Sequence, residues 1–127
     1  MSLQAKYQAV LNLGEELGAQ NGSVEEKDGK LVMTGLVHTQ YEKNLLWDKI
    51  KEIGGSDAND IVADINVETN DYFAIYTVQT GDTLGKIAKR FYEEPKKYTQ
   101  IFAANTDVLA HPDKIEVGQI LKIPFEV

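Results

Sequence analysis

Cysteine and histidine, two residue types that often carry enzyme chemistry, are scarce in this sequence. It contains no cysteine and two histidines, His38 and His111, which lie far apart along the chain. Without cysteine there is no thiol nucleophile, thiolate metal site or disulfide framework. Neither histidine belongs to a metal-ligand spacing such as H-x-x-x-H, and each falls at an expected loop or helix start. We therefore expect two solvated histidines, no catalytic residues and no resident cofactor.

One oxygen-rich segment, Ser56–Asp60, invites a calcium interpretation, because hard cations prefer oxygen ligands. The segment lacks the central glycine and the distal glutamate that an EF-hand loop uses. Asp and Asn also favour turns, since their side chains bond to nearby backbone groups. We favour a turn that leads into the next strand.

Aromatic side chains are candidates for stacking on a sugar ring, and Trp47, Tyr72, Phe73 and Tyr76 are of this kind. Trp47 shares a helical face with Ile50, which favours a place in the core. Tyr72 and Phe73 fall in an expected linker, where packing explains them without a ligand. The aromatic residues alone do not decide whether a carbohydrate binds.

The charge of the chain is unevenly distributed. Residues up to Asp71 include 6 basic and 13 acidic side chains, and those from Tyr72 onward include 7 of each, so the net charge of −7 lies in the first part. An acidic surface repels phosphate backbones, and no basic stripe with interleaved aromatic residues offsets that repulsion. Nucleic acid is therefore an unsuitable partner.

The N-terminal residues lack the basic start, continuous apolar run and small-residue cleavage site of a secretory signal. No segment reaches the length of a membrane span. We expect a cytoplasmic protein without membrane insertion, and a periplasmic one if a leader has been removed.

The first part of the chain predicts the element order α-β-β-α-β. Apolar residues at helical spacing indicate one amphipathic helix over Leu3–Leu17, with Gly18 as its stop. Asp28-Gly29 joins two short strands in a hairpin. Thr39 caps a second helix that ends at Gly54-Gly55, and the alternating segment Ile61–Val67 is the last strand. Two helices over a three-stranded sheet would bury both apolar helix faces.

This part of the sequence resembles a BON domain over roughly Leu3 to Val67. The similarity rests on a hairpin that ends in an apolar-x-Gly-x-Val motif, here Met33, Gly35 and Val37, followed by a helix and a strand. We place the BON-like domain at residues 1–71. A short linker without helical or strand periodicity is expected at about residues 68–74.

The second part, residues 75–127, predicts β-α-α-β. Asp82 or Thr83 caps a helix, and Pro95 occupies the first turn of a second helix. The two strands are expected at Tyr76–Gln79 and Ile120–Ile123. The inward side chains of the helices are predicted to be Leu84, Ile87, Ala88, Phe91, Tyr98, Ile101 and Phe102. The whole chain is therefore expected to have an α+β fold.

This second part resembles the LysM family over about its whole length. The landmarks are spread through the module in the family order: Tyr76, Val78, the turn Gly81-Asp82-Thr83-Leu84, Ile87-Ala88, Asn105, Ile115, Gly118-Gln119 and Leu121 to Pro124. LysM modules bind polymers that contain N-acetylglucosamine, such as peptidoglycan or chitin, in a shallow groove.

The resemblance places that carbohydrate-binding groove between two walls. One wall is Gly81, Asp82, Thr83 and Leu84, and the other is Asn105, Asp107, Pro112, Asp113 and Ile115. Backbone groups at a glycine turn can pair with acetamide groups, and Ile115 can cover an acetyl methyl. The same residues also suit a turn, a cap and a core, so both roles remain open.

A BON domain followed by one LysM domain resembles the bacterial cytoplasmic potassium-binding protein family linked to osmotic stress. This resemblance implies a monomeric K⁺-binding protein of the stress response whose LysM domain closes onto the BON domain. A cage of backbone carbonyls suits K⁺, and the turn at Gly54 and Gly55 is a candidate position for it. LysM-mediated glycan binding is the first alternative, and a scaffold or interaction module is the second.

Overall fold

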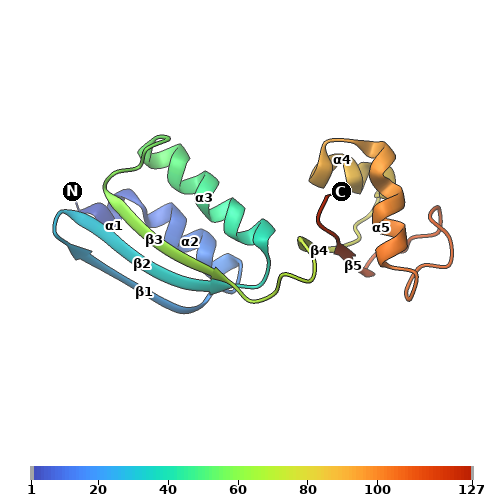
Figure 1. Ribbon diagram of the computed structural model, residues 1–127, viewed down its shortest axis with the longest axis horizontal. Coiled ribbons are helices and arrows are strands. Elements are labelled where there is room, and N and C mark those ends of the chain that lie inside the picture. Colours follow the sequence, from blue (N-terminus) through green and yellow to red (C-terminus); the bar gives the residue numbers. More distant parts are fainter. Residues whose placement is uncertain (1, 127) are drawn as a thin grey trace. The chain divides into compact units, whose positions relative to one another are not determined.

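The computed structural model describes residues 2–126 (Figure 1). The chain forms two compact units, one up to Asn70 and one from Asp71 onward. Each unit has its own sheet, of three strands in the first and two in the second. The mixed helix and strand content confirms the α+β fold class.

The first unit is a three-stranded sheet with helices on one face. Strand β2 lies in the centre, antiparallel to β1 and parallel to β3, and α3 makes the crossover between the parallel strands (Figure 1). The elements in chain order are α1 (Leu3–Lys6), α2 (Gln8–Glu16), β1 (Gln20–Lys27), β2 (Lys30–Val37), α3 (Gln40–Gly54) and β3 (Ile61–Val67).

The prediction of a single N-terminal helix over Leu3–Leu17 is wrong in one respect, because the structure contains two helices separated at Tyr7. Tyr7 has φ −100° and ψ 18°, outside the helical region, and separates α1 from α2. Its side chain is fully buried. Burying this ring fixes the backbone at that point, and such a tertiary constraint leaves no trace in the local periodicity. Gly18, with φ 74°, follows the second helix as expected.

The hairpin between β1 and β2 and helix α3 agree with the sequence predictions. Asp28 and Gly29 have φ 54° and 78°, the positive values that a two-residue hairpin turn requires. Thr39 and Glu42 form a capping box at the start of α3, each side chain accepting the backbone N–H of the other. Strand β3 has the predicted bounds.

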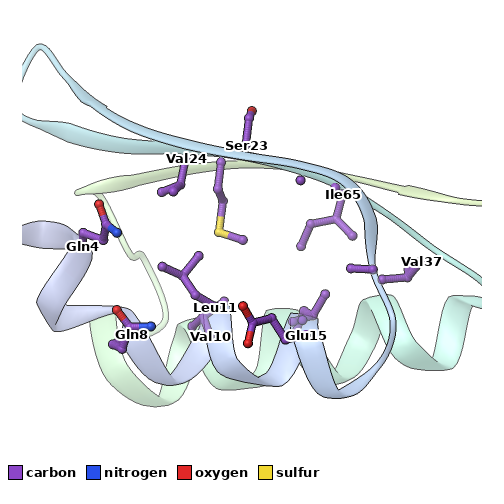
Figure 2. Close-up of a pocket in the computed structure, with 15 residues that line it drawn as sticks. Gln4, Gln8, Val10, Leu11, Glu15, Ser23, Val24, Val37 and Ile65 are labelled. Carbon is purple, nitrogen blue, oxygen red and sulfur yellow. The ribbon is translucent and has the colours of Figure 1, made fainter.

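The core of the first unit lies between the helices and the sheet. Its centre includes Val10 of α2, Leu31 of β2, Ile50 of α3 and Ile65 of β3, and Trp47 packs partly buried against them. The filling is incomplete at one place. A pocket of about 370 Å³ opens between α2 and the sheet (Figure 2).

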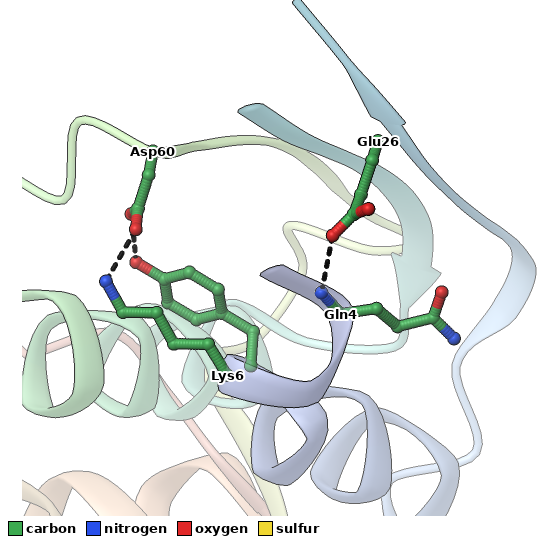
Figure 3. Close-up of polar contacts among 5 residues, drawn as sticks. Gln4, Lys6, Glu26 and Asp60 are labelled. Atoms are coloured by element: carbon green, nitrogen blue, oxygen red, sulfur yellow. Dashed lines mark hydrogen bonds and ion pairs between the residues drawn. The ribbon is translucent and has the colours of Figure 1, made fainter. Parts of the chain in front are cut away.

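A polar cluster joins the N-terminal helices to the loop before β3. The Asp60 carboxylate accepts hydrogen bonds from Lys6 Nζ, at 2.5 Å, and from the Tyr7 hydroxyl (Figure 3). These two hydrogen bonds lower the pKa of Asp60, and the bond from Lys6 has the larger effect. The pKa of Tyr7 is raised to about 12, mainly because its hydroxyl is buried. Gly54 is required beside this ring, since a Cβ there would lie 2.1 Å from the Tyr7 hydroxyl oxygen.

The second unit pairs its first and last strands. Strand β4 (Ala74–Thr77) is antiparallel to β5 (Ile120–Ile123), with Ala74 opposite Ile123. Between them lie α4 (Leu84–Tyr92), the 3₁₀ turn η1 (Pro95–Lys97) and α5 (Tyr98–Ala104). The predicted bounds shift slightly: Ala74 is a fully buried strand residue rather than linker, and β4 ends at Thr77 rather than Gln79.

The helices of the second unit bury most of the predicted residues. Ile87, Ala88 and Ile101 are almost completely inaccessible. Tyr98 is the exception: its side chain is 38% exposed rather than inward. Tyr98 is the first residue of α5, directly after the 3₁₀ turn, whereas Ile101 and Phe102, one turn further along, are buried and half-buried as predicted.

Candidate functional site

A groove in the second unit brings together six of the nine residues that the sequence places on the LysM walls. Its volume is about 330 Å³. The lining consists of Asp82, Thr83, Leu84, Gly85, Tyr98, Pro112, Asp113 and Ile115. Segments about thirty residues apart in the chain therefore face one another across one depression.

The first wall is fixed by the turn between β4 and α4. Gly81 has φ 86°, a conformation that favours glycine, and its carbonyl accepts a hydrogen bond from Lys86 Nζ at 3.1 Å. Of the two predicted caps, Thr83 is the one used, since its hydroxyl accepts the Lys86 N–H. The start of α4 is thus held at the groove by its own cap.

Asp82 holds the turn from the other side. Its carboxylate accepts the Tyr76 hydroxyl at 2.6 Å and the Gln79 N–H at 2.8 Å. These two hydrogen bonds lower the pKa of Asp82, and the bond from Tyr76 has the larger effect. The carboxylate is therefore ionised at neutral pH, and its position is preorganised by contacts within the protein.

The second wall is the loop before β5. Pro112 and Ile115 are half-buried there. The loop folds back on itself, with His111 Nδ1 accepting the Asp113 N–H at 3.1 Å and the His111 carbonyl accepting the Lys114 N–H. His111 thus shapes the loop.

The remaining three predicted residues do not line the groove. Gly81 is part of the turn but is not among the lining residues, and Asp107 is exposed outside the groove. Asn105 is 2% exposed. Its amide donates to the carbonyls of Ile101 and Lys122 and accepts the Lys122 N–H, at 2.7 to 2.8 Å. These bonds tie α5 to the free edge of β5, which explains the residue without a ligand.

Tyr98 is the lining residue that sequence reasoning missed. It begins α5 and is the one aromatic side chain among the lining residues. The available signal was Pro95, because proline often opens a helix with a tight turn and such a turn shifts the next side chains around the axis. An exposed aromatic ring beside polar groups suits a sugar face.

The other candidate residues occupy ordinary structural positions. Asp60 ends the segment Ser56–Asp60, where its carboxylate is engaged by Lys6 and Tyr7 and its carbonyl accepts the Leu31 N–H. His38 Nδ1 lies 3.3 Å from the Glu68 carboxylate. Within residues 2–126, no three His, Asp or Glu side chains are grouped as metal ligands.

The turn at Gly54 and Gly55 closes the C-terminal end of α3. Gly55 has φ 85°, and its N–H bonds to the Lys51 carbonyl at 2.9 Å. Carbonyls in the last turn of a helix lack intrahelical partners and carry partial negative charge. A carbonyl site for a cation at this end stays a prediction.

Comparison with known proteins agrees with this architecture. Residues 76–124 match the LysM domain family, so the fold and the groove define a LysM-domain protein with an additional N-terminal α+β unit. The potassium binding protein Kbp of Escherichia coli is 36% identical over 122 residues, which are 95% of this chain and 80% of that protein. The chain belongs to the family of Kbp.

In other relatives, the region that matches this chain is a smaller part of the protein. A protein of Deinococcus radiodurans is 29% identical over 121 residues and is covered to 46%. The esterase Rv1288 of Mycobacterium tuberculosis is 47% identical over 51 residues, but these make up 11% of that enzyme. The long match to Kbp and the LysM module therefore identify a binding protein. None of the helices in the part that the structure describes is long and apolar enough to cross a membrane.

Proposed function

We propose that this chain is a non-catalytic, potassium-binding protein of the bacterial cytoplasm that acts in the response to osmotic stress. The observation that carries the proposal is the reach of the similarity to Kbp, which covers 95% of the chain and therefore both units. A match confined to the LysM module would support glycan binding alone.

The charge distribution is compatible with a cation as ligand. The net charge of −7 lies before Tyr72, so the first unit attracts cations. This attraction is screened within about 8 Å at physiological salt and does not distinguish K⁺ from Na⁺. Selectivity requires fixed carbonyl oxygens. The end of α3 at Gly54 and Gly55 is where we propose that such oxygens are offered.

A thermal melt at constant ionic strength tests the proposal. A ligand that binds only the native state raises the free energy of unfolding, by about 2.7 kcal/mol at a concentration one hundred times Kd, and so raises the midpoint temperature. We expect KCl to raise the midpoint of the first unit above its value in NaCl. Equal midpoints in the two salts would contradict the proposal.

Two glycine variants test the position of the ion. Gly55 and Gly29 have nearly equal positive φ values, 85° and 78°, and a Cβ at either meets nothing within 4 Å. Gly55→Ala and Gly29→Ala each strain a glycine turn, and Gly55→Ala the more so because φ 85° with ψ 172° is essentially restricted to glycine, so the K⁺-dependent shift of each variant is measured against its own midpoint in NaCl. If the ion lies at the end of α3, the K⁺-dependent shift is lost in Gly55→Ala and kept in Gly29→Ala.

Glycan binding is the second candidate, favoured by the groove that unites six predicted wall residues with Tyr98. A shallow site supports an affinity of about micromolar to millimolar. We expect chitooligosaccharide to shift the NMR signals of Thr83, Tyr98 and Ile115. Ile115→Ala should weaken this binding, whereas Val117→Ala, a similar truncation of a side chain that is 65% exposed and outside the groove, should not. No hydrolysis of the oligosaccharide is expected.

A further inference from the structure

The pocket between α2 and the sheet of the first unit is a cavity that neither proposed function uses. Its volume of about 370 Å³ falls within the range of about 300–1,000 Å³ that is usual for small-molecule sites. The walls are mainly apolar side chains of α2 and the sheet, among them Val10, Leu11, Met33 and Ile65 (Figure 2).

The pocket exists because side chains are missing where the core should be filled. Glycines 14, 22 and 35 line it, one each from α2, β1 and β2. Gly35 is the most telling, since it lies between Met33 and Val37 on the inward face of β2. Those two neighbours on that face are buried, and a Cβ added at Gly35 would meet nothing within 4 Å. No turn or close contact therefore requires glycine at this position.

The only charge in the lining of the pocket is negative. Glu15 is its one charged side chain, and its carboxylate lies on the helix side of the gap (Figure 2). Within residues 2–126 this carboxylate forms no hydrogen bond or ion pair. The amides of Gln4 and Gln8 lie toward the other end of the pocket, with Leu11 between them and Glu15 (Figure 2), and no Lys or Arg lines the pocket.

We propose that this pocket binds a small amphiphilic cation, an aliphatic chain with an ammonium head, whose chain enters among Leu11, Met33 and Ile65 and whose head pairs with Glu15. An ammonium group has three donors and no acceptor, which suits a carboxylate. A fatty acid would bring two carboxylates together. The acidic first unit also raises the local concentration of cations. The site is separate from the proposed K⁺ and glycan sites, so its failure would leave both untouched.

Octylammonium, octanol and octanoate are suitable probes, because they share a chain and differ in the head group. Met33 lines the pocket, so ¹³C-methyl labelling of methionine gives a reporter signal in its wall. We expect octylammonium, at constant K⁺ concentration, to shift the Met33 signal. Its affinity should exceed that of octanol about two- to fivefold, as for an exposed ion pair, and octanoate should bind weakest. Shortening the chain by one methylene should weaken binding at most about fourfold.

Two variants separate the apolar and the charged parts of the site. Gly35→Val places a side chain where an added Cβ meets nothing within 4 Å, and it should abolish binding of octylammonium and octanol while preserving or raising the melting temperature. Glu15→Gln should abolish the preference for octylammonium over octanol. Glu16→Gln, an exposed neighbour outside the lining, should retain it.

Three results would overturn the proposal. They are an unmoved Met33 signal at millimolar octylammonium, equal affinity for octanoate and octylammonium, and a preference for the cation that survives Glu15→Gln. If Gly35→Val does not fold, the comparison of Glu15→Gln with Glu16→Gln still decides the matter.

Discussion

Replacing Asn105 by alanine tests whether this residue serves stability rather than ligand binding. Strand β5 has one neighbour, β4, and the side-chain amide of Asn105 pairs with both the N–H and the C=O of Lys122. It therefore bonds to the open edge of β5 as a third strand would. Asn105→Ala leaves those two backbone groups without this partner.

The expected loss follows from the number of groups involved. An unsatisfied buried backbone group costs about 1–3 kcal/mol, and since Lys122 itself is exposed, we take about 2–4 kcal/mol for the pair. The unit from Asp71 onward is small, and a domain of this size has a total stability of about 3–8 kcal/mol. At about 4–8 °C per kcal/mol, the variant should lower the melting temperature of this unit by about 8–32 °C.

Calorimetry and amide exchange check this expectation. The transition of the second unit should move while that of the first unit stays, and the Lys122 amide should lose protection from exchange. Thr106→Ala, the adjacent exposed residue, should change stability by less than about 0.5 kcal/mol. A loss below that value in Asn105→Ala, or an equal fall in both transitions, would refute the structural role.

Three further predictions concern the first unit. Thr39→Ala removes half of the capping box of α3 and should lower the free energy of unfolding by about 1 kcal/mol in chemical denaturation. Gly54→Ala places a Cβ 2.1 Å from the Tyr7 hydroxyl and should be clearly destabilising, whereas Tyr7→Phe in the same chain should relieve part of that loss, as a double-mutant cycle would measure. Hydrogen bonds from Lys6 and Tyr7 hold the pKa of Asp60 below its ordinary value of 3.8, so the contribution of this carboxylate is complete above that pH and lost as the pH falls through the folded-state pKa. Asp60→Asn should therefore flatten the acid side of the stability profile, and an unchanged profile would contradict the assignment.

The elements that sequence reasoning located well are those with local causes. The capping box at Thr39, the positive φ values at Asp28 and Gly29 and the alternation over Ile61–Val67 are all decided by neighbouring residues. The interruption of the first helix was not predictable in this way. It depends on Tyr7 being buried against residues some fifty positions later in the chain, and a short window does not contain that contact.

The sites show the same division. The groove walls came from the family resemblance, which carries three-dimensional information that composition lacks. Asn105 was placed on a wall by the same resemblance, yet its side-chain bonds to Lys122 are made within the protein. The pocket beside Gly35 was missed because an absent side chain gives no signal, and this glycine was interpreted only as part of a fold motif.

The pairing of β4 with β5 sets where the chain enters and leaves the second unit. Because Ala74 at the start of β4 lies opposite Ile123 at the end of β5, entry and exit are adjacent on one side of the fold. A unit with neighbouring ends can be spliced into a loop of another protein without stretching its host, or appended to either end with a short connection. Because of this geometry, the second unit can be inserted into, or fused to, unrelated proteins as an independent domain.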